Sequence, residues 1–171
     1  MGNVNRHVTT VLAGFVLLAV AAQAADINQV MANTESRRRA AENGLKDIKA
    51  KGEPSGDVRD TYAAAAAATN TWLDSVCQAI ERGSASAPDV SASAQQAADS
   101  LVAWVNVRNR ILGVPEVAGT AVDVVKKSVT QDLTAIAETT WKANRSADAK
   151  KRGSAVNALK ERLRWKAFDE I

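Results

Sequence analysis

Residues 57–112 read DVRDTYAAAAAATNTWLDSVCQAIERGSASAPDVSASAQQAADSLVAWVNVRNRIL, and this stretch decides the fold. In each half, apolar residues recur at steps of three and four, so they form one stripe along a helix. Asp57 and Asp89 precede the two patterns as N-caps, and Gly83 and Gly113 follow them as residues that can end a helix in the left-handed conformation. The stretch therefore predicts a hairpin of two amphipathic helices. The stripes consist of Val58, Tyr62, Ala65, Thr69, Trp72, Val76 and Ile80, then Val90, Ala94, Ala97, Leu101, Trp104, Arg108 and Leu112.

The two tryptophans of this hairpin are predicted to belong to the core. A short connection favours antiparallel neighbours, which places Trp104 opposite residues 65–68 and Trp72 opposite residues 97–101. Each indole then faces a part of the partner helix that is rich in alanine, and large residues against small ones fill an interior densely. The alternative is that the indoles are platforms for a ligand.

Residues 1–24 have the features of a signal peptide. Arg6 and His7 form a short positive region, residues 8–20 are apolar, and Ala22-Gln23-Ala24 matches the small-x-small cleavage pattern. We therefore expect cleavage after Ala24 and a periplasmic or secreted protein. The alternative, an uncleaved anchor, is disfavoured because the apolar run is shorter than the roughly 20 residues of a spanning helix.

Residues 25–171 are expected to form a single helical-bundle domain. Further helical patterns cover residues 26–51 and 115–144, and a basic helix is predicted over residues 146–168. Alternation of β-branched and polar residues, the mark of a strand, is absent. The predicted fold class is all-α, an antiparallel bundle of four to five helices.

The chemistry that the sequence lacks argues against an enzyme. Cleavage would remove His7, the only histidine, and with it any Ser-His-Asp arrangement or histidine-containing metal site. The sequence also contains no glycine-rich phosphate loop and no Gly-x-Ser-x-Gly motif. We expect no catalytic residues, no cofactor and no metal. Cys77, the single cysteine, is interpreted as a small hydrophobic residue or as the partner in an intermolecular disulfide.

The C-terminal segment has an unusual composition. Residues 142–166 include nine basic and two acidic residues, and Trp165 is predicted to project from the polar side of the helix. Tryptophan and arginine are frequent at binding hot spots, although Trp165 could equally fold back over a neighbouring helix. The candidate residues for partner or anion binding here are Trp165, Arg162, Arg164, Lys166, Phe168, Lys150, Lys151 and Arg152.

Three other features add to the candidate surface or limit it. Arg108 interrupts the apolar stripe of its helix, so it must extend to solvent, pair with a carboxylate or bind an anion. Trp141 lies about 100° from the stripe of its own helix. Residues 37–39 are consecutive arginines, which cannot share one face of a helix, so we expect a solvated surface there.

Two functions are compatible with these features. The leading prediction is a non-enzymatic module of the cell envelope that binds a protein partner through a helix face, because Trp141 and Trp165 are expected to lie off their stripes. The alternative is a protein that binds an anionic surface, either membrane headgroups or an envelope polymer, through the basic C-terminal helix and its additional Lys160. A nucleic-acid partner is not expected, and no small-molecule substrate is indicated.

Overall fold

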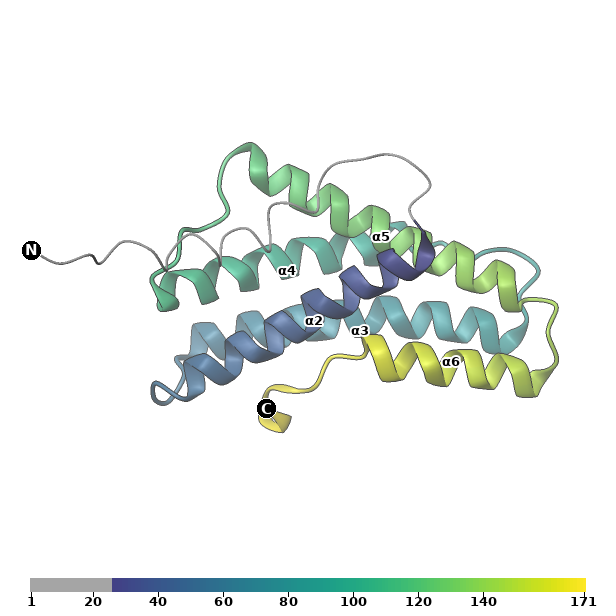
Figure 1. The fold of residues 1–171 in the computed structure, drawn as a ribbon, viewed down its shortest axis with the longest axis horizontal. Helices are drawn as coiled ribbons and strands as arrows, with labels where there is room; N and C mark the ends of the chain where they lie inside the picture. Colours follow the sequence, from purple (N-terminus) through teal and green to yellow (C-terminus); the bar gives the residue numbers. More distant parts are fainter. Residues whose placement is uncertain (1–25) are drawn as a thin grey trace, which may run out of the picture.

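The computed structural model describes residues 26–171, and all regular secondary structure in this part of the chain is helical, with no strand. The α-helices are α2 (Ile27–Lys49), α3 (Gly56–Arg82), α4 (Ser91–Leu112), α5 (Thr120–Asn144) and α6 (Ala149–Leu163), followed by the short 3-10 helix η1 (Phe168–Glu170) (Figure 1). The predicted all-α fold class is confirmed. The signal peptide predicted for residues 1–24 lies outside the described residues.

The predicted hairpin is present as α3 and α4, which run in opposite directions (Figure 1). Gly83 and Gly113 end these helices with φ of 62° and 70°, as expected for glycine at a helix C-terminus. The predicted N-cap positions are wrong by one or two residues, although Asp89 does accept a hydrogen bond from Ser91 N, in the first turn of α4, at 3.1 Å. Ser55 precedes α3 and Val90 precedes α4. Asp57 instead lies in the first turn of α3, where a negative charge still interacts favourably with the helix dipole.

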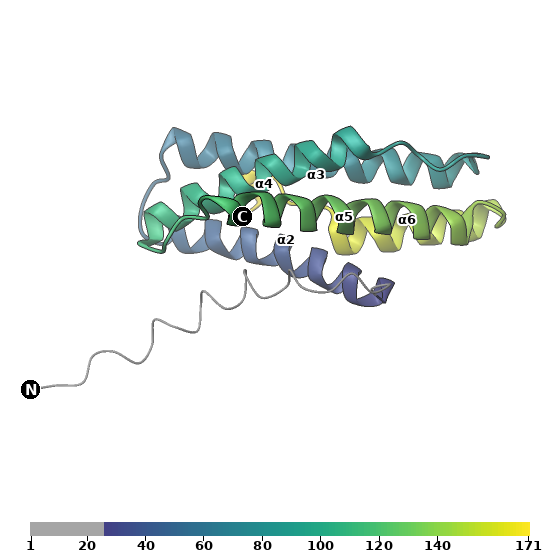
Figure 2. The ribbon, with the colours of Figure 1, turned by 90° about the horizontal axis from the view of Figure 1, so that it is seen from above.

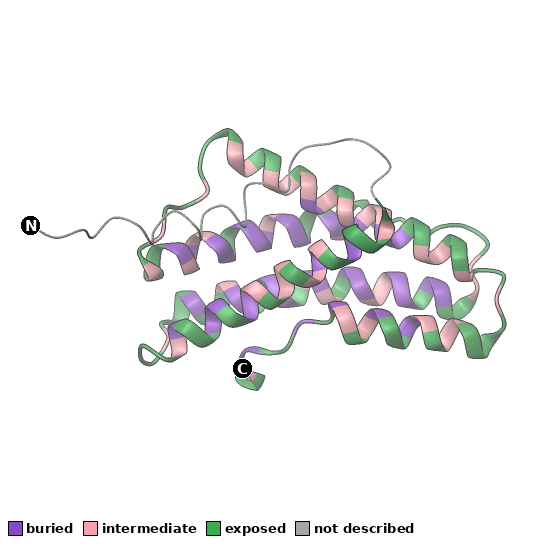
Figure 3. Cartoon of the chain, in the orientation of Figure 1, coloured by how far each residue is buried: buried purple, intermediate pink, exposed green. Residues whose placement is uncertain are grey.

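The other helices cover this hairpin. Figure 2 shows α3 along one side of the molecule and α2 along the other, and α2 also packs directly on α4. Helix α6 packs mainly on α3, and α5 packs mainly on α4 and α2. The buried residues concentrate on the facing sides of the helices (Figure 3). None of the described helices is long and apolar enough to span a membrane.

The core is built around three aromatic side chains of the hairpin. Trp72, Trp104 and Tyr62 have no exposed surface, and the alanines that face inward, such as Ala65 and Ala94, are also fully buried. The Tyr62 and Trp104 rings meet edge to face, with centroids 5.2 Å apart. The prediction that both hairpin tryptophans are core residues is confirmed.

Helix α5 begins later than predicted, because two asparagines of α4 hold the preceding loop. The Asn106 side chain accepts a hydrogen bond from Val117 N at 2.7 Å and donates one to Val117 O at 3.0 Å. Asn109 donates to Pro115 O at 2.9 Å. These bonds fix residues 113–119 in a non-helical conformation, so the helix starts at Thr120 rather than at Pro115.

The arginine triplet of α2 also differs from expectation, since only Arg39 is largely exposed. Arg37 donates to Asp132 of α5 at 2.5 Å and to Ser128 at 3.2 Å. Arg38 donates to Glu42 at 2.7 Å and to the carbonyl of Arg162 at 2.9 Å. Consecutive arginines point in different directions around a helix, so one reaches α5 and another reaches the end of α6.

Candidate interaction surfaces

The basic C-terminal helix ends earlier than predicted, at Leu163. Residues 164–171, which we call the C-terminal tail, leave the helix in an extended conformation and turn once more in η1. Because the chain is extended at this point, the helical geometry that would have placed Trp165 on a polar face does not apply. Trp165 is only 5% exposed and Phe168 only 8%. The structure therefore supports the second interpretation of Trp165, in which the indole covers neighbouring helices.

Most of the candidate arginines bond to other helices of the bundle. Arg162 donates to Glu35 of α2 at 3.1 Å, and this bond lowers the pKa of the Glu35 carboxyl. Arg164 pairs with Asp74 of α3. Arg152 donates to the carbonyl of Glu81, near the end of α3, at 3.2 Å. These side chains attach α6 and the tail to α2 and α3, so the strong local charge is partly compensated within the fold.

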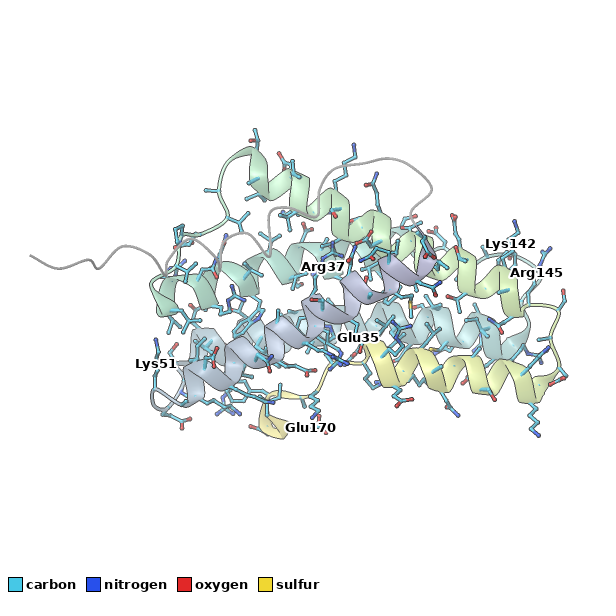
Figure 4. All side chains as sticks on the ribbon, in the orientation of Figure 1. Glu35, Arg37, Lys51, Lys142, Arg145 and Glu170 are labelled. Carbon is cyan, nitrogen blue, oxygen red and sulfur yellow. The ribbon has the colours of Figure 1, made fainter. Side chains whose placement is uncertain are left out.

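The remaining lysines of the candidate set are exposed. Lys150 and Lys151 lie in the first turn of α6, and Lys166 lies in the tail. None of the ion pairs within residues 26–171 involves them. Lys142 of α5 and Arg145, which directly follows this helix, lie at the same end of the bundle as the start of α6, as Figure 4 shows. We call Lys142, Arg145, Lys150 and Lys151 the basic end.

Trp141 is half-buried and has partners inside the molecule. Its Nε1 donates to Ser84 O at 3.0 Å, which ties α5 to the loop between α3 and α4. The Arg145 guanidinium lies over the ring, 4.9 Å from its centroid. The position of Trp141 off the apolar stripe therefore lets its side chain bind the loop between α3 and α4.

Arg108 is half-buried between α4 and α2. Its Nε and Nη2 donate to the Asn109 side chain at 3.1 and 2.6 Å, and burial lowers the pKa of its guanidinium while Asp47 acts in the opposite direction. Its aliphatic stem lies against Gly44, where an added Cβ would come within 2.4 Å of Arg108 Cδ. Gly44 therefore lets α2 pack over the arginine stem, which explains a residue with low helical propensity in the middle of a helix.

The exposed apolar surface lies elsewhere and was not identified from the sequence. Ile111 at the end of α4 is 41% exposed and Val124 in the first half of α5 is 47% exposed. Neither residue lies on the apolar stripe of its helix, so the prediction of the core passed over both. The signal that could have revealed them is this position, a large hydrophobic residue off the apolar side of an amphipathic helix.

No three His, Cys, Asp or Glu side chains within residues 26–171 are close enough to hold a metal ion. A cavity of about 20 Å³ lies between the helices beside Trp165, lined also by Thr34 and Thr69. This volume is enough for about one water molecule.

Cys77 is 1% exposed, which favours its interpretation as a hydrophobic core residue. Burial raises the pKa of its thiol to about 11 from the usual value of 9.0. Between these two pH values, the Cys77 thiol stays protonated in the folded chain but is ionised in the unfolded chain. Ionisation therefore favours the unfolded chain, and the free energy of unfolding should decrease as the pH rises from about 9 to about 11.

We expect iodoacetamide to label Cys77 slowly in the folded protein at pH 8 and rapidly in denaturant, because the thiolate is the reactive form. Intact-mass measurement over time checks this. The Cys77→Ala variant should show a smaller loss of stability between pH 9 and 11 than the unsubstituted protein. Rapid labelling of the folded chain, or a disulfide-linked dimer on a non-reducing gel, would contradict the buried position.

No family model matches the sequence, and neither a curated protein nor a solved structure is significantly similar to it.

Proposed function

We propose that this protein is a non-enzymatic interaction module of the cell envelope that binds an amphipathic helix of a protein partner. The contact surface is the apolar face around Ile111 and Val124, which we call the α4–α5 face. The observation that supports the proposal is the exposure of these two side chains, the only large hydrophobic residues of the described chain that are exposed. The location in the envelope depends on the signal peptide expected for residues 1–24.

The geometry of α5 explains why a helix would fit this face. The apolar stripe of α5 is half-buried at Val122 and Val125 but fully covered from Val129 onward. Arg37 of α2 binds the face of α5 at Ser128 and Asp132. Beyond this point α2 diverges from the first half of α5, as Figure 1 shows. A partner helix at that position would cover the first half of α5, which α2 does not cover.

The surroundings of the α4–α5 face are suited to a protein contact. Charged residues surround the apolar side chains, including exposed Asp123 and Lys127 on α5 and Glu116 before it. An apolar centre with a charged rim is the usual composition of a protein interface. Recognition of a helix by its apolar face requires anchors about one turn apart on the partner.

The test is a photo-crosslinking amino acid placed at Val124 in the protein expressed in its source cells, with Lys51 as the control position. Lys51 is exposed near the end of α2 and lies outside the proposed face. We expect one protein species to be crosslinked from position 124 and not from position 51. With that partner purified, Val124→Asp should weaken binding by roughly tenfold or more, as for a contact worth over 1.4 kcal/mol. Unchanged affinity of the folded variant would reject the α4–α5 face.

The basic end supports the second candidate function, binding to an anionic surface. Lys150 and Lys151 lie at the N-terminus of α6, where the helix dipole disfavours positive charge. Their position is therefore not explained by the stability of α6. Lys142 and Arg145 add charge at the same end (Figure 4).

Vesicles with and without anionic lipid test this alternative. Binding through the basic end should decrease steeply with salt and should be reduced by Lys150→Ala combined with Lys151→Ala. Lys46→Ala combined with Lys51→Ala, near the opposite end of the molecule, is the matched control. Substitutions are preferable to removing residues 146–171, because that deletion would also remove Trp165 and Phe168 from the core. Binding that is insensitive to both salt and the substitutions would exclude this function.

A further inference from the structure

The C-terminal tail is bound to the rest of the protein as an extended peptide is bound to a receptor. In Figure 1 it leaves α6 and continues along the bundle beside α2 and α3. Its hydrogen-bond, ion-pair and aromatic partners come from these two helices, which are complete without it. Trp165 also lines a small cavity together with residues of α4 and α5. Release of the tail would break one helical hydrogen bond of α6, that of Arg164 N to Lys160 O.

Side chains of α2 and α3 bind the backbone of the tail. Asn70 accepts from Trp165 N at 3.0 Å and donates to Trp165 O at 3.2 Å. Tyr62 donates its hydroxyl to Lys166 O at 3.0 Å, and Glu42 accepts from Lys166 N at 3.4 Å. Lys49 donates to Phe168 O at 2.7 Å. These bonds recognise an extended backbone and do not depend on the side chains that it carries.

Two aromatic side chains of the tail supply the specific contacts. Trp165 and Phe168 both contact Tyr62, with ring centroids 5.8 and 6.3 Å from the tyrosine ring. The Phe168 ring also receives two cations, Lys49 Nζ at 4.2 Å and Arg59 Cζ at 4.6 Å from its centroid. The receptor surface thus selects aromatic residues three positions apart.

Charges at the two ends of the tail set its direction. Arg164 pairs with Asp74 of α3 before the first aromatic residue. Asp169 lies 3.7 Å from Arg59 after the second. A ligand of this surface would therefore carry a basic residue before its tryptophan and an acidic residue after its phenylalanine.

We propose that the surface formed by Glu42, Lys49, Tyr62 and Asn70 is a peptide-binding site, which the protein's own tail occupies in the resting state. The partner is an extended segment of another protein with the chemistry basic-Trp-x-x-Phe-acidic. This site is separate from the α4–α5 face and does not depend on it. Because the tail is tethered, its effective concentration is in the millimolar range, so a partner peptide must compete with it.

The experiment measures binding of a fluorescent peptide of residues 164–171 to the full chain in which Trp165→Ala and Phe168→Ala weaken the resident tail. We expect saturable binding to this variant, and binding at least about tenfold weaker to the unsubstituted chain, whose site is occupied. A peptide with alanine in place of its tryptophan is the ligand control. The full chain with Trp165→Leu and Phe168→Leu, which keeps apolar side chains at both positions, is the second receptor and should bind the same peptide.

Asn70→Ala in the tail-weakened chain identifies the site. It removes two hydrogen bonds to the peptide, so we expect affinity to fall about tenfold or more. Asn106→Ala is the matched control, because Asn106 makes the same pair of bonds to Val117 in a distant loop. The control should leave peptide affinity unchanged.

Several results would overturn the proposal. These are failure of both folded receptors to bind the peptide at millimolar concentration, or equal effects of Asn70→Ala and Asn106→Ala. Loss of helical circular dichroism in both receptors would show that the tail is a fixed part of the core. A dimer of the unsubstituted chain that the peptide dissociates would assign the surface to the tail of a second copy.

Discussion

Trp104→Ala is expected to lower the free energy of unfolding by about 3–5 kcal/mol, the range observed when a buried tryptophan is truncated in a core. The indole has no exposed surface and meets Tyr62 edge to face at 5.2 Å. The helices on both sides of it are held by their other contacts, so the space left by the ring cannot close completely. Urea denaturation followed by circular dichroism measures the change.

Trp104→Phe is the matched control for this variant. Phenylalanine keeps an aromatic ring and removes the indole N–H, which is buried and has no acceptor among the described residues. An unpaired buried donor costs about 1–3 kcal/mol, so its removal offsets part of the lost packing. We therefore expect a clearly smaller loss than for alanine. If Trp104→Ala changes stability by less than about 1 kcal/mol, the indole is not packed as described.

Tyr62→Ala should have a similar effect, a loss of about 3–5 kcal/mol, taking the value for large aromatic core residues. Tyr62 contacts Trp104 of α4 and also Trp165 and Phe168 of the tail, so its ring joins the hairpin to the end of the chain. Its removal should loosen the tail as well as the core. Hydrogen exchange of the amides of residues 165 and 166 would show the local loosening, and denaturation would give the global change.

Tyr62→Phe separates the hydroxyl from the ring. It removes only the hydrogen bond to Lys166 O, and a bond of this kind contributes about 0.5–1.5 kcal/mol. We expect the core to stay intact and the exchange of the tail amides to increase. Equal losses for the alanine and phenylalanine variants would show that the hydroxyl, and not the packing of the ring, dominates the contribution of Tyr62.

Periodicity in the sequence was sufficient for the central hairpin. The apolar stripes that contain Trp72 and Trp104 indicate which side of each helix is buried. Burial of apolar surface is the largest favourable term in folding, so these stripes determine how the two helices pack. The glycines that end α3 and α4 were also identified correctly, because positive φ is a local requirement.

The errors at the start of α5 and at the end of α6 have a common physical cause, which is hydrogen bonding of asparagine side chains to the backbone of another segment. Helix α5 starts later than predicted because Asn106 and Asn109 bind the backbone of the preceding loop. These three hydrogen bonds cannot be inferred from the helical propensities of the loop residues. The same holds for the end of α6, where Asn70 pairs with the backbone of Trp165 from a residue 95 positions away. Of the candidate site residues, Trp165 and Arg162 are engaged within the fold, whereas Lys150, Lys151 and Lys166 are exposed as expected.

The sequence by itself determined that this chain is helical and which faces of the hairpin are buried, because helix periodicity and apolar burial act over a few residues. Only the tertiary structure decided the position of the tail, the pairing of the arginines and the exposure of Ile111 and Val124. Those features depend on which helix ends near which other helix, and a side chain that is exposed on its own helix becomes buried when another helix or an extended segment packs over it.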